Sequence, residues 1–160
     1  MTLVIRQGEP ADVPLIAELI RGLARYEKLE HEVTMTEERL AANLFGASHH
    51  YAETLIAEVD GSPVGFALFF HNFSTFLAQP GIYLEDLFVT PEHRGGGIGR
   101  ALLKELARLA IERQCGRLEW SVLDWNREAI GFYERLGARP NSEWTVYRLT
   151  GEALSALGRE

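Results

Sequence analysis

The chain has 160 residues, of which 46% are hydrophobic and 24% charged, a composition typical of globular proteins and not of disordered ones. A chain of this length buries roughly two thirds of its surface around one core, so we expect a single domain over residues 1–160. The formal net charge is −7, from 16 basic and 23 acidic residues. This balance disfavours binding to nucleic acid or to an anionic membrane and favours small cationic partners.

The single cysteine, Cys115, excludes an internal disulfide, and we expect it to be a small buried side chain without a catalytic role. The N-terminal segment lacks the basic and then apolar pattern of a secretion signal. No apolar run reaches the roughly 18 residues that a membrane span requires. We therefore expect a cytoplasmic protein. The five histidines form no metal-ligand pattern, so no metal is expected.

The first half of the chain alternates short β-rich runs with helical periodicity. Residues 3–5 predict a strand, and the apolar residues that follow predict a helix ending near Tyr26. A second, peripheral helix is expected to begin at Thr34 or Thr36. Two further β-rich runs flank a cluster of turn-forming residues and predict a hairpin of antiparallel strands, with the strands at 55–59 and 64–70.

The second half is expected to contain a strand, a glycine-rich loop, a long helix, a strand, a helix, a strand and a short terminal helix. The corresponding segments are Ile82–Val89, 94–99, 98–113, 117–123, 126–136, 144–149 and 152–157. The long helix is predicted to be a crossover, so the strands on either side of it should be parallel. Gly137 stands where a left-handed residue ends a helix. Together these elements predict one α/β fold with mixed α+β character.

The loop Arg94-Gly-Gly-Gly-Ile-Gly99 holds four glycines in six residues, between an expected strand and an expected helix. Without Cβ atoms, the backbone N–H groups of such a loop are accessible to a phosphate at the positive end of the helix dipole. A Walker loop is excluded because no Gly-Lys-Ser/Thr sequence is present, and Arg100 stands where a dinucleotide-binding fingerprint begun at Gly95 needs glycine or alanine. The alternative is a purely structural turn.

The pattern Arg94-x-x-Gly97-x-Gly99 resembles the acetyl-CoA-binding signature of the GNAT superfamily of N-acetyltransferases. Four segments of the chain resemble the spermidine/spermine (diamine) acetyltransferase branch of that superfamily. They are Tyr26-Glu27, Tyr83–Val89, Trp125-Asn126 and Phe132–Ala138. The resemblance covers residues 4–150 and implies a central mixed sheet of about six to seven strands flanked by about four helices. It also implies that an acetyl group moves from acetyl-CoA to a primary amine of a small cationic acceptor, such as a polyamine, by direct attack in a ternary complex.

The resemblance also implies a binding site for the donor. The amides of the glycine loop hold the pyrophosphate, and the backbone of the strand before the loop pairs with the pantetheine amides. Asn126 binds CoA and can also cap the helix that follows it. Tyr133 is explained by packing alone as a core residue, whereas the resemblance makes it the acid that protonates the departing thiolate. The implied donor residues are Leu87, Phe88, Val89, Arg94, Gly95, Gly96, Gly97, Ile98, Gly99, Arg100, Asn126 and Tyr133.

The acceptor must lose a proton before it attacks, because an alkyl ammonium has a pKa of about 10.4. Glu85 and Asp86 are adjacent carboxylates in an otherwise apolar strand, where successive side chains face opposite sides unless a bulge intervenes. A surface pair without function is the alternative. The resemblance favours Glu85 as the residue that binds the acceptor and takes its proton through water. It gives the acceptor site as Tyr26, Glu27, Glu85, Asp86, Glu119 and Trp120.

Other functions stay open on the sequence. A lysine-like amino acid such as thialysine would need a cationic or amide partner for its carboxylate, whereas a polyamine would need a second acidic site. A module that binds acyl-CoA without efficient chemistry is a second alternative, against which Glu85 and Tyr133 argue together. Acetylation of a protein would need a peptide groove that no sequence feature indicates. Many proteins resembling this family are homodimers, and the aromatic-rich segment 66–76 together with three tryptophans is a candidate interface.

Overall fold

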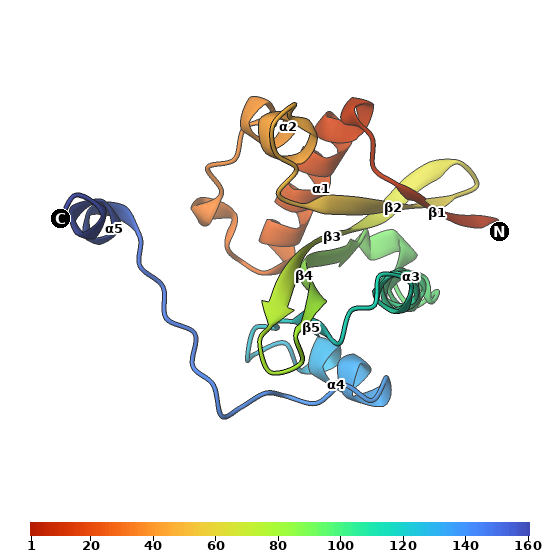
Figure 1. The fold of residues 1–160 in the computed structure, drawn as a ribbon. Coiled ribbons are helices and arrows are strands. Elements are labelled where there is room, and N and C mark those ends of the chain that lie inside the picture. Colours follow the sequence, from red (N-terminus) through yellow and green to blue (C-terminus); the bar gives the residue numbers. More distant parts are fainter. The chain divides into compact units, whose positions relative to one another are not determined.

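A computed structural model describes residues 1–160, which form two compact units, Met1–Ser121 and Val122–Glu160. The first unit contains one sheet of five strands in the order β1-β2-β3-β4-β5 (Figure 1). The strands are β1 (Leu3–Gln7), β2 (Glu53–Val59), β3 (Ser62–Ser74), β4 (Gln79–Val89) and β5 (Leu118–Trp120). The first four are antiparallel neighbours, and β5 is parallel to β4. The predicted hairpin and the predicted crossover are both confirmed.

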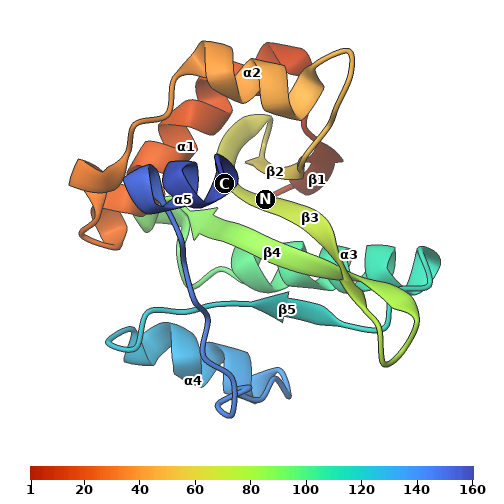
Figure 2. The same cartoon turned by 60° about the vertical axis from the view of Figure 1, so that its left-hand side comes forward.

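Three α-helices of the first unit cover the sheet, α1 (Val13–Tyr26), α2 (Glu37–Phe45) and α3 (Ile98–Glu112). Figures 1 and 2 show α1 and α2 on one face of the sheet and α3 on the other. Helix α2 begins after Thr36, whose side-chain oxygen accepts a hydrogen bond from the Arg39 amide at 3.1 Å. Three short 3-10 helices complete this unit, η1 (Pro10–Asp12), η2 (Glu30–Glu32) and η3 (Pro91–His93).

The core between the sheet and the two helices α1 and α2 contains large apolar side chains from every layer. Apolar residues at helical spacing give α1 one continuous buried face. The cluster of buried residues consists of Ile16, Leu19, Leu23, Leu44, Ile56, Phe66 and Phe88. On the other face, α3 buries Leu102, Leu103 and Leu106. Burial of both sheet faces explains why β3 and β4 have apolar residues at consecutive positions.

Strand β4 contains a bulge. Leu68 of β3 pairs with Asp86, whereas the next residue of β3, Phe69, pairs with Leu84, so Glu85 has no partner on β3. One extra residue in a strand interrupts the alternation of side chains between the two faces. At this bulge, Glu85 and Asp86 are thus not bound by the rule that successive side chains face opposite sides of the sheet.

Strands β4 and β5 separate at the same place. Their pairing covers only Ile82–Leu84 of β4, which face Leu118–Trp120 of β5. From Asp86 to Val89, β4 is paired with β3 alone, and Glu85 is paired with neither strand. The backbone N–H and C=O groups on the β5 side of this segment are thus left without a strand partner.

The second unit contains α4 (Arg127–Arg135) and α5 (Gly151–Gly158). Asn126 caps α4, because its side-chain oxygen accepts a hydrogen bond from the Ala129 amide at 3.2 Å. Gly137 has a φ of 93° and follows the end of the helix, as its position in the sequence predicts.

The prediction of a strand over residues 144–149 is wrong. These residues form no strand, so the sheet has five strands and not six to seven, and five α-helices accompany it where about four were expected. A strand requires hydrogen bonds to a neighbour, and residues 139–160 are all exposed in the single chain. Apolar side chains are among them, with Trp144 74% and Tyr147 94% exposed. No helix of the structure has both the length and the apolar character to cross a membrane.

Candidate functional site

Three carboxylates form an acidic cluster, Glu27 at the end of α1 and the pair Glu85 and Asp86 at the bulge of β4. Residues that pair across two strands share a face of the sheet. Asp86 pairs with Leu68, which packs against the core under α1 and α2, so Asp86 belongs to that face too. Asp86 is partly buried there, and Glu85 is exposed.

The charges of the acidic cluster interact. Burial is the main cause that raises the pKa of Asp86 to about 7, and the charges of Glu85 and Glu27 raise it further. The pKa of Glu27 is also raised, first by burial and then by Glu85. Like charges this close destabilise one another, and a bound cation would relieve the repulsion. The cluster is therefore suited to bind an ammonium group and, at Asp86, to accept a proton near neutral pH.

The open edge of β4 lies directly beside the acidic cluster in the chain. Leu87, Phe88 and Val89 follow the bulge, and none of them is paired with β5. An exposed strand edge can form backbone hydrogen bonds with an extended ligand that contains amide groups. The three residues that are expected from the sequence to bind the pantetheine chain thus lie on the segment of β4 that is not paired with β5.

The glycine loop leads from this edge into α3. Gly95 and Gly97 have φ values of 81° and 84°, in the left-handed region that favours glycine. Gly97 immediately precedes α3, and no side chain caps the first turn of this helix. The N–H groups of that turn have no partner within the helix, and they lie at the positive end of its dipole. Together with the loop amides they fit a phosphate group.

The Arg94 side chain contacts the end of α1. Its guanidinium carbon lies 4.3 Å from the centre of the Tyr26 ring and 5.5 Å from that of Phe88. Its Nε donates a hydrogen bond to the Val89 carbonyl at 3.0 Å. The structure therefore brings Tyr26, expected at the acceptor site, into contact with Arg94, expected at the donor site.

Glu119 and Trp120 lie in β5, where they pair with Tyr83 and Leu84 of β4. The Glu119 carboxylate accepts a hydrogen bond from the Asn72 side chain at 3.2 Å. Neither residue contributes to the raised pKa of Asp86 or Glu27. The structure thus groups Glu27, Glu85 and Asp86 electrostatically and gives Glu119 a partner on β3.

Asn126 and Tyr133 belong to the second unit. Asn126 is buried at the start of α4, and Tyr133 is partly buried on the same helix, with its ring centre 5.5 Å from that of Phe132. Both positions agree with the helical pattern of the sequence. Their roles toward CoA stay predictions.

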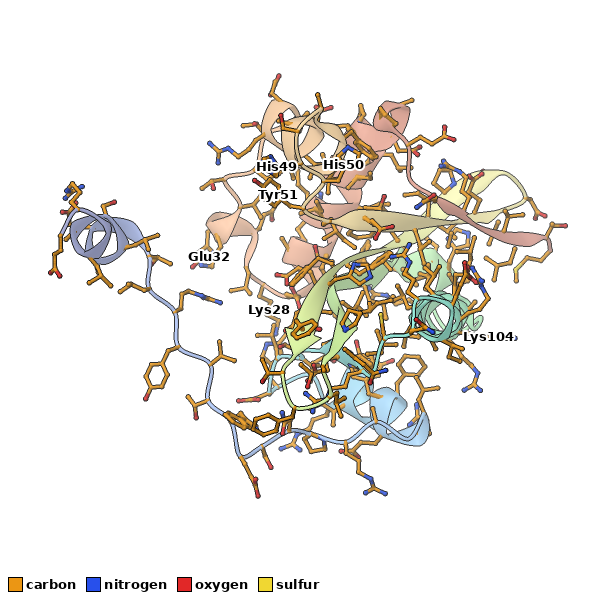
Figure 3. All side chains as sticks on the ribbon, viewed as in Figure 1. Lys28, Glu32, His49, His50, Tyr51 and Lys104 are labelled. Carbon is orange, nitrogen blue, oxygen red and sulfur yellow. The ribbon has the colours of Figure 1, made fainter.

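No group of three or more His, Cys, Asp or Glu side chains is placed to hold a metal ion. His49 and His50 lie in the loop between α2 and β2, at the top of the view in Figure 3, and His49 stacks on Tyr51 with ring centres 5.2 Å apart. Cys115, expected to be buried, is partly exposed, because the chain has already left α3 at Glu112.

Comparison with known proteins identifies the class. A profile of the acetyltransferase (GNAT) family matches residues 16–138. A thialysine N-epsilon-acetyltransferase from Bos taurus is 39% identical over 166 residues, covering 97% of this chain and 96% of that protein. The Homo sapiens spermidine/spermine N(1)-acetyltransferase-like protein 1 is 33% identical, covering 98% of this chain and 24% of that protein. An integron cassette protein of V. cholerae has a solved structure with a TM-score of 0.81 and 30% identity, covering 100% of this chain and 99% of that chain.

The chain therefore belongs to the GNAT family of acetyltransferases. It is an N-acetyltransferase that acts on an amine, and acetyl-CoA is the acetyl donor of this family. The superfamily and the mixed α/β fold that the sequence predicted are confirmed.

Replacement of Gly97 by alanine should weaken acetyl-CoA binding at least about tenfold, because a left-handed φ costs a residue with a Cβ about 1 to 2 kcal/mol and moves the loop amides. Isothermal calorimetry would measure the dissociation constant. Gly61 is the matched control, since it also has a positive φ, 83°, and nothing within 4 Å of an added Cβ. Gly61→Ala should lose similar stability and keep its affinity; equal affinities in both variants would remove the loop from the donor site.

Proposed function

We propose that the chain acetylates the terminal primary amine of a small acceptor with an aminoalkyl chain, by direct attack of the amine on acetyl-CoA. The carrying observation is the acidic cluster at the point where β4 separates from β5. There, carboxylates that bind an ammonium group stand in the chain next to an open strand edge that fits the pantetheine amides. A module that only binds acyl-CoA does not require a carboxylate with a pKa near neutrality, whereas proton transfer from an amine does.

In the proposed reaction the glycine loop and the edge of Leu87–Val89 hold the donor, and the acidic cluster holds the acceptor. Asp86 takes the proton from the ammonium group, directly or through one water, because its pKa of about 7 is suited to a base at neutral pH. Exposed Glu85 at the bulge supplies negative charge that attracts the cation. The neutral amine then attacks the thioester carbonyl, the C–S bond breaks, and Tyr133 protonates the CoA thiolate that leaves. The second proton that the nitrogen loses as the amide forms replaces the one that Tyr133 gave.

Two acceptors remain candidates for this site. The relative at 39% identity is named for thialysine, and its length matches this chain almost throughout. The relative at 33% identity is named for spermidine and spermine, and this chain covers 24% of it. We therefore rank lysine-like amino acids ahead of polyamines. The acidic cluster fits the terminal ammonium group of either acceptor.

The decisive assay is release of free thiol from acetyl-CoA by the purified protein with spermidine, putrescine, lysine, thialysine or an aminoglycoside. The proposal predicts the highest kcat/KM with thialysine or lysine. Higher kcat/KM with spermidine or putrescine would keep the reaction and reverse the ranking. Binding of acetyl-CoA without thiol release from any acceptor would contradict the proposal and favour a binding module.

The pH profile tests the base. With Asp86 as the base, kcat/KM for the amine should rise as the pH increases through about 7, because the deprotonated carboxylate accumulates. Asp86→Asn should abolish this rise and lower kcat/KM about 100-fold or more. Glu85→Gln should keep the rise and move its midpoint to lower pH, because one of the charges that raise the Asp86 pKa is gone.

A rise that persists in Asp86→Asn and disappears in Glu85→Gln would make Glu85 the base. Exposed Glu92 of η3 provides a matched control, and Glu92→Gln should leave the profile unchanged. Unfolding offers a readout that is independent of activity. The folded protein holds a proton on Asp86 more tightly than the unfolded chain does, so its free energy of unfolding should fall between pH 4 and pH 7, as Asp86 ionises.

Tyr133→Phe should lower kcat about 100-fold and leave the affinity for acetyl-CoA nearly unchanged, because only the proton donor to the thiolate is lost. Steady-state kinetics and calorimetry measure the two quantities. Tyr147→Phe, at a tyrosine of the same unit that is 94% exposed, is the control. Unchanged turnover in Tyr133→Phe would exclude this tyrosine as the acid.

We also propose that the chain works as a cytoplasmic homodimer of single-domain protomers. Phe66 and Phe69 of the segment 66–76 are buried in the sheet, whereas Phe73 and Phe76 are exposed. The exposed apolar side chains of residues 144–149 add further surface of this kind. Light scattering that gives a mass near the 18.0 kDa of one chain would contradict a dimer.

A further inference from the structure

We propose that Arg94 is a positioning residue that couples the two substrate sites by fixing the end of α1 against the start of the glycine loop. The inference rests on the proposed function, which places the donor on that loop and the acceptor beside Glu27. In this inference the Arg94 side chain contacts α1, and the backbone amides of the loop bind the phosphate groups.

The Arg94 side chain is held both by a hydrogen bond to the backbone of β4 and by aromatic rings of α1 and β4. Its Nε is bonded to the Val89 carbonyl, the last residue of β4, at 3.0 Å. Its guanidinium covers the Tyr26 ring at 4.3 Å and approaches the Phe88 ring to 5.5 Å. A planar guanidinium stacks on an aromatic ring in a way that the ammonium group of a lysine does not reproduce. Since Arg94 is the first residue of the loop, a movement of the loop is transmitted directly to Tyr26.

Helix α1 is built to accept this contact. Gly22 lies one turn before Tyr26, and a Cβ on Gly22 would be only 2.9 Å from the Phe88 ring. The absence of a side chain at Gly22 thus lets α1 approach β4 closely, so that Phe88 and Tyr26 lie together under Arg94.

Helix α1 ends in a turn with a left-handed residue, and a contact at Tyr26 can stabilise this turn. Glu27 and Lys28 follow Tyr26, and Lys28, labelled in Figure 3, has a φ of 62°. The Lys28 amide donates to the Arg25 carbonyl and the Leu29 amide to the Ala24 carbonyl, at 3.1 and 2.9 Å. A left-handed residue with a side chain persists where its surroundings hold it. Stacking of Arg94 on Tyr26 provides such support, next to the carboxylate of Glu27.

This arrangement couples donor and acceptor binding. A donor that orders the loop also orders Arg94, and Arg94 in turn fixes Tyr26 and Glu27 in position for the amine. Acetyl-CoA should therefore increase the affinity for the amine, and by linkage the amine should increase the affinity for acetyl-CoA to the same extent.

The test compares Arg94→Lys with Arg94→Ala. Both variants lose the stacked guanidinium, so both should raise the KM of the amine about fivefold or more, while the dissociation constant of acetyl-CoA changes less than about threefold. Exposed Arg39 of α2 is the control, and Arg39→Lys should change neither quantity. If the charge of Arg94 acts on the phosphates instead, lysine restores wild-type kinetics and only alanine loses affinity for acetyl-CoA, which would overturn the inference.

A double-mutant cycle with Tyr26 adds a second arm. Relative to Tyr26→Phe, which keeps the ring, Tyr26→Leu should raise the KM of the amine, and Arg94→Lys should have no further effect in the leucine background. Additive effects of the two substitutions would show that Arg94 does not act through this ring.

Hydrogen exchange separates failure of this inference from failure of the proposed function. In the wild-type protein, acetyl-CoA should slow exchange of the amides of Glu27, Lys28 and Leu29, even if no acceptor is known. Arg94→Lys should bind acetyl-CoA and lose this protection. Protection that is equal in both proteins, or absent from both although acetyl-CoA is bound, would overturn the inference whatever the amine assay shows.

Discussion

The separation of β4 from β5 after Leu84 is the constraint on which the site depends. Parallel strands normally satisfy their backbone groups along their whole length, and here the ladder stops after three residues of each strand. Beyond the bulge, the segment Asp86–Val89 is held in the sheet by β3 alone, which leaves one edge open. A ligand with amide groups can complete the ladder that the protein leaves unfinished.

The acidic cluster carries an energetic cost in the free protein. Burial and mutual repulsion raise the pKa of Asp86 and of Glu27, which means that the folded state stabilises their neutral forms. In the proposed function, a cationic amine that binds at the cluster removes this repulsion, and the relief of the repulsion adds to the binding free energy. The same effects bring the pKa of Asp86 to about 7, closer to neutral pH than that of a solvated aspartate.

The sequence predicts most of the first unit, because its elements follow from local patterns. Helical spacing in α1 and α3 and the turn-forming residues between β2 and β3 are each read from a few neighbouring residues. The strand expected at 144–149 has the right local pattern, and fails because pairing is a long-range property. The pattern of side chains in residues 144–149 does not show whether another strand is available to pair with them.

The sequence predicts which residues belong to the candidate site better than it predicts the role of each one. Adjacent carboxylates in an apolar strand single out Glu85 and Asp86, and the raised pKa of Asp86 depends on burial, which only the fold determines. The contact of Arg94 with Tyr26 joins residues 68 positions apart in the chain, and no local pattern announces it. Glycine at position 22 is a weak signal of the close approach that makes the contact possible.

The bulge at Glu85 also bears on how such a site can arise or be lost. On either side of it the pairs Phe69 with Leu84 and Leu68 with Asp86 are those of a regular ladder from which one residue could be excised. Removal of Glu85 would therefore leave the register and the core on both flanks intact. In evolutionary terms, a single codon inserted into or deleted from the middle of this strand can add or remove a carboxylate at the bulge without a new fold, and without repacking either face of the sheet.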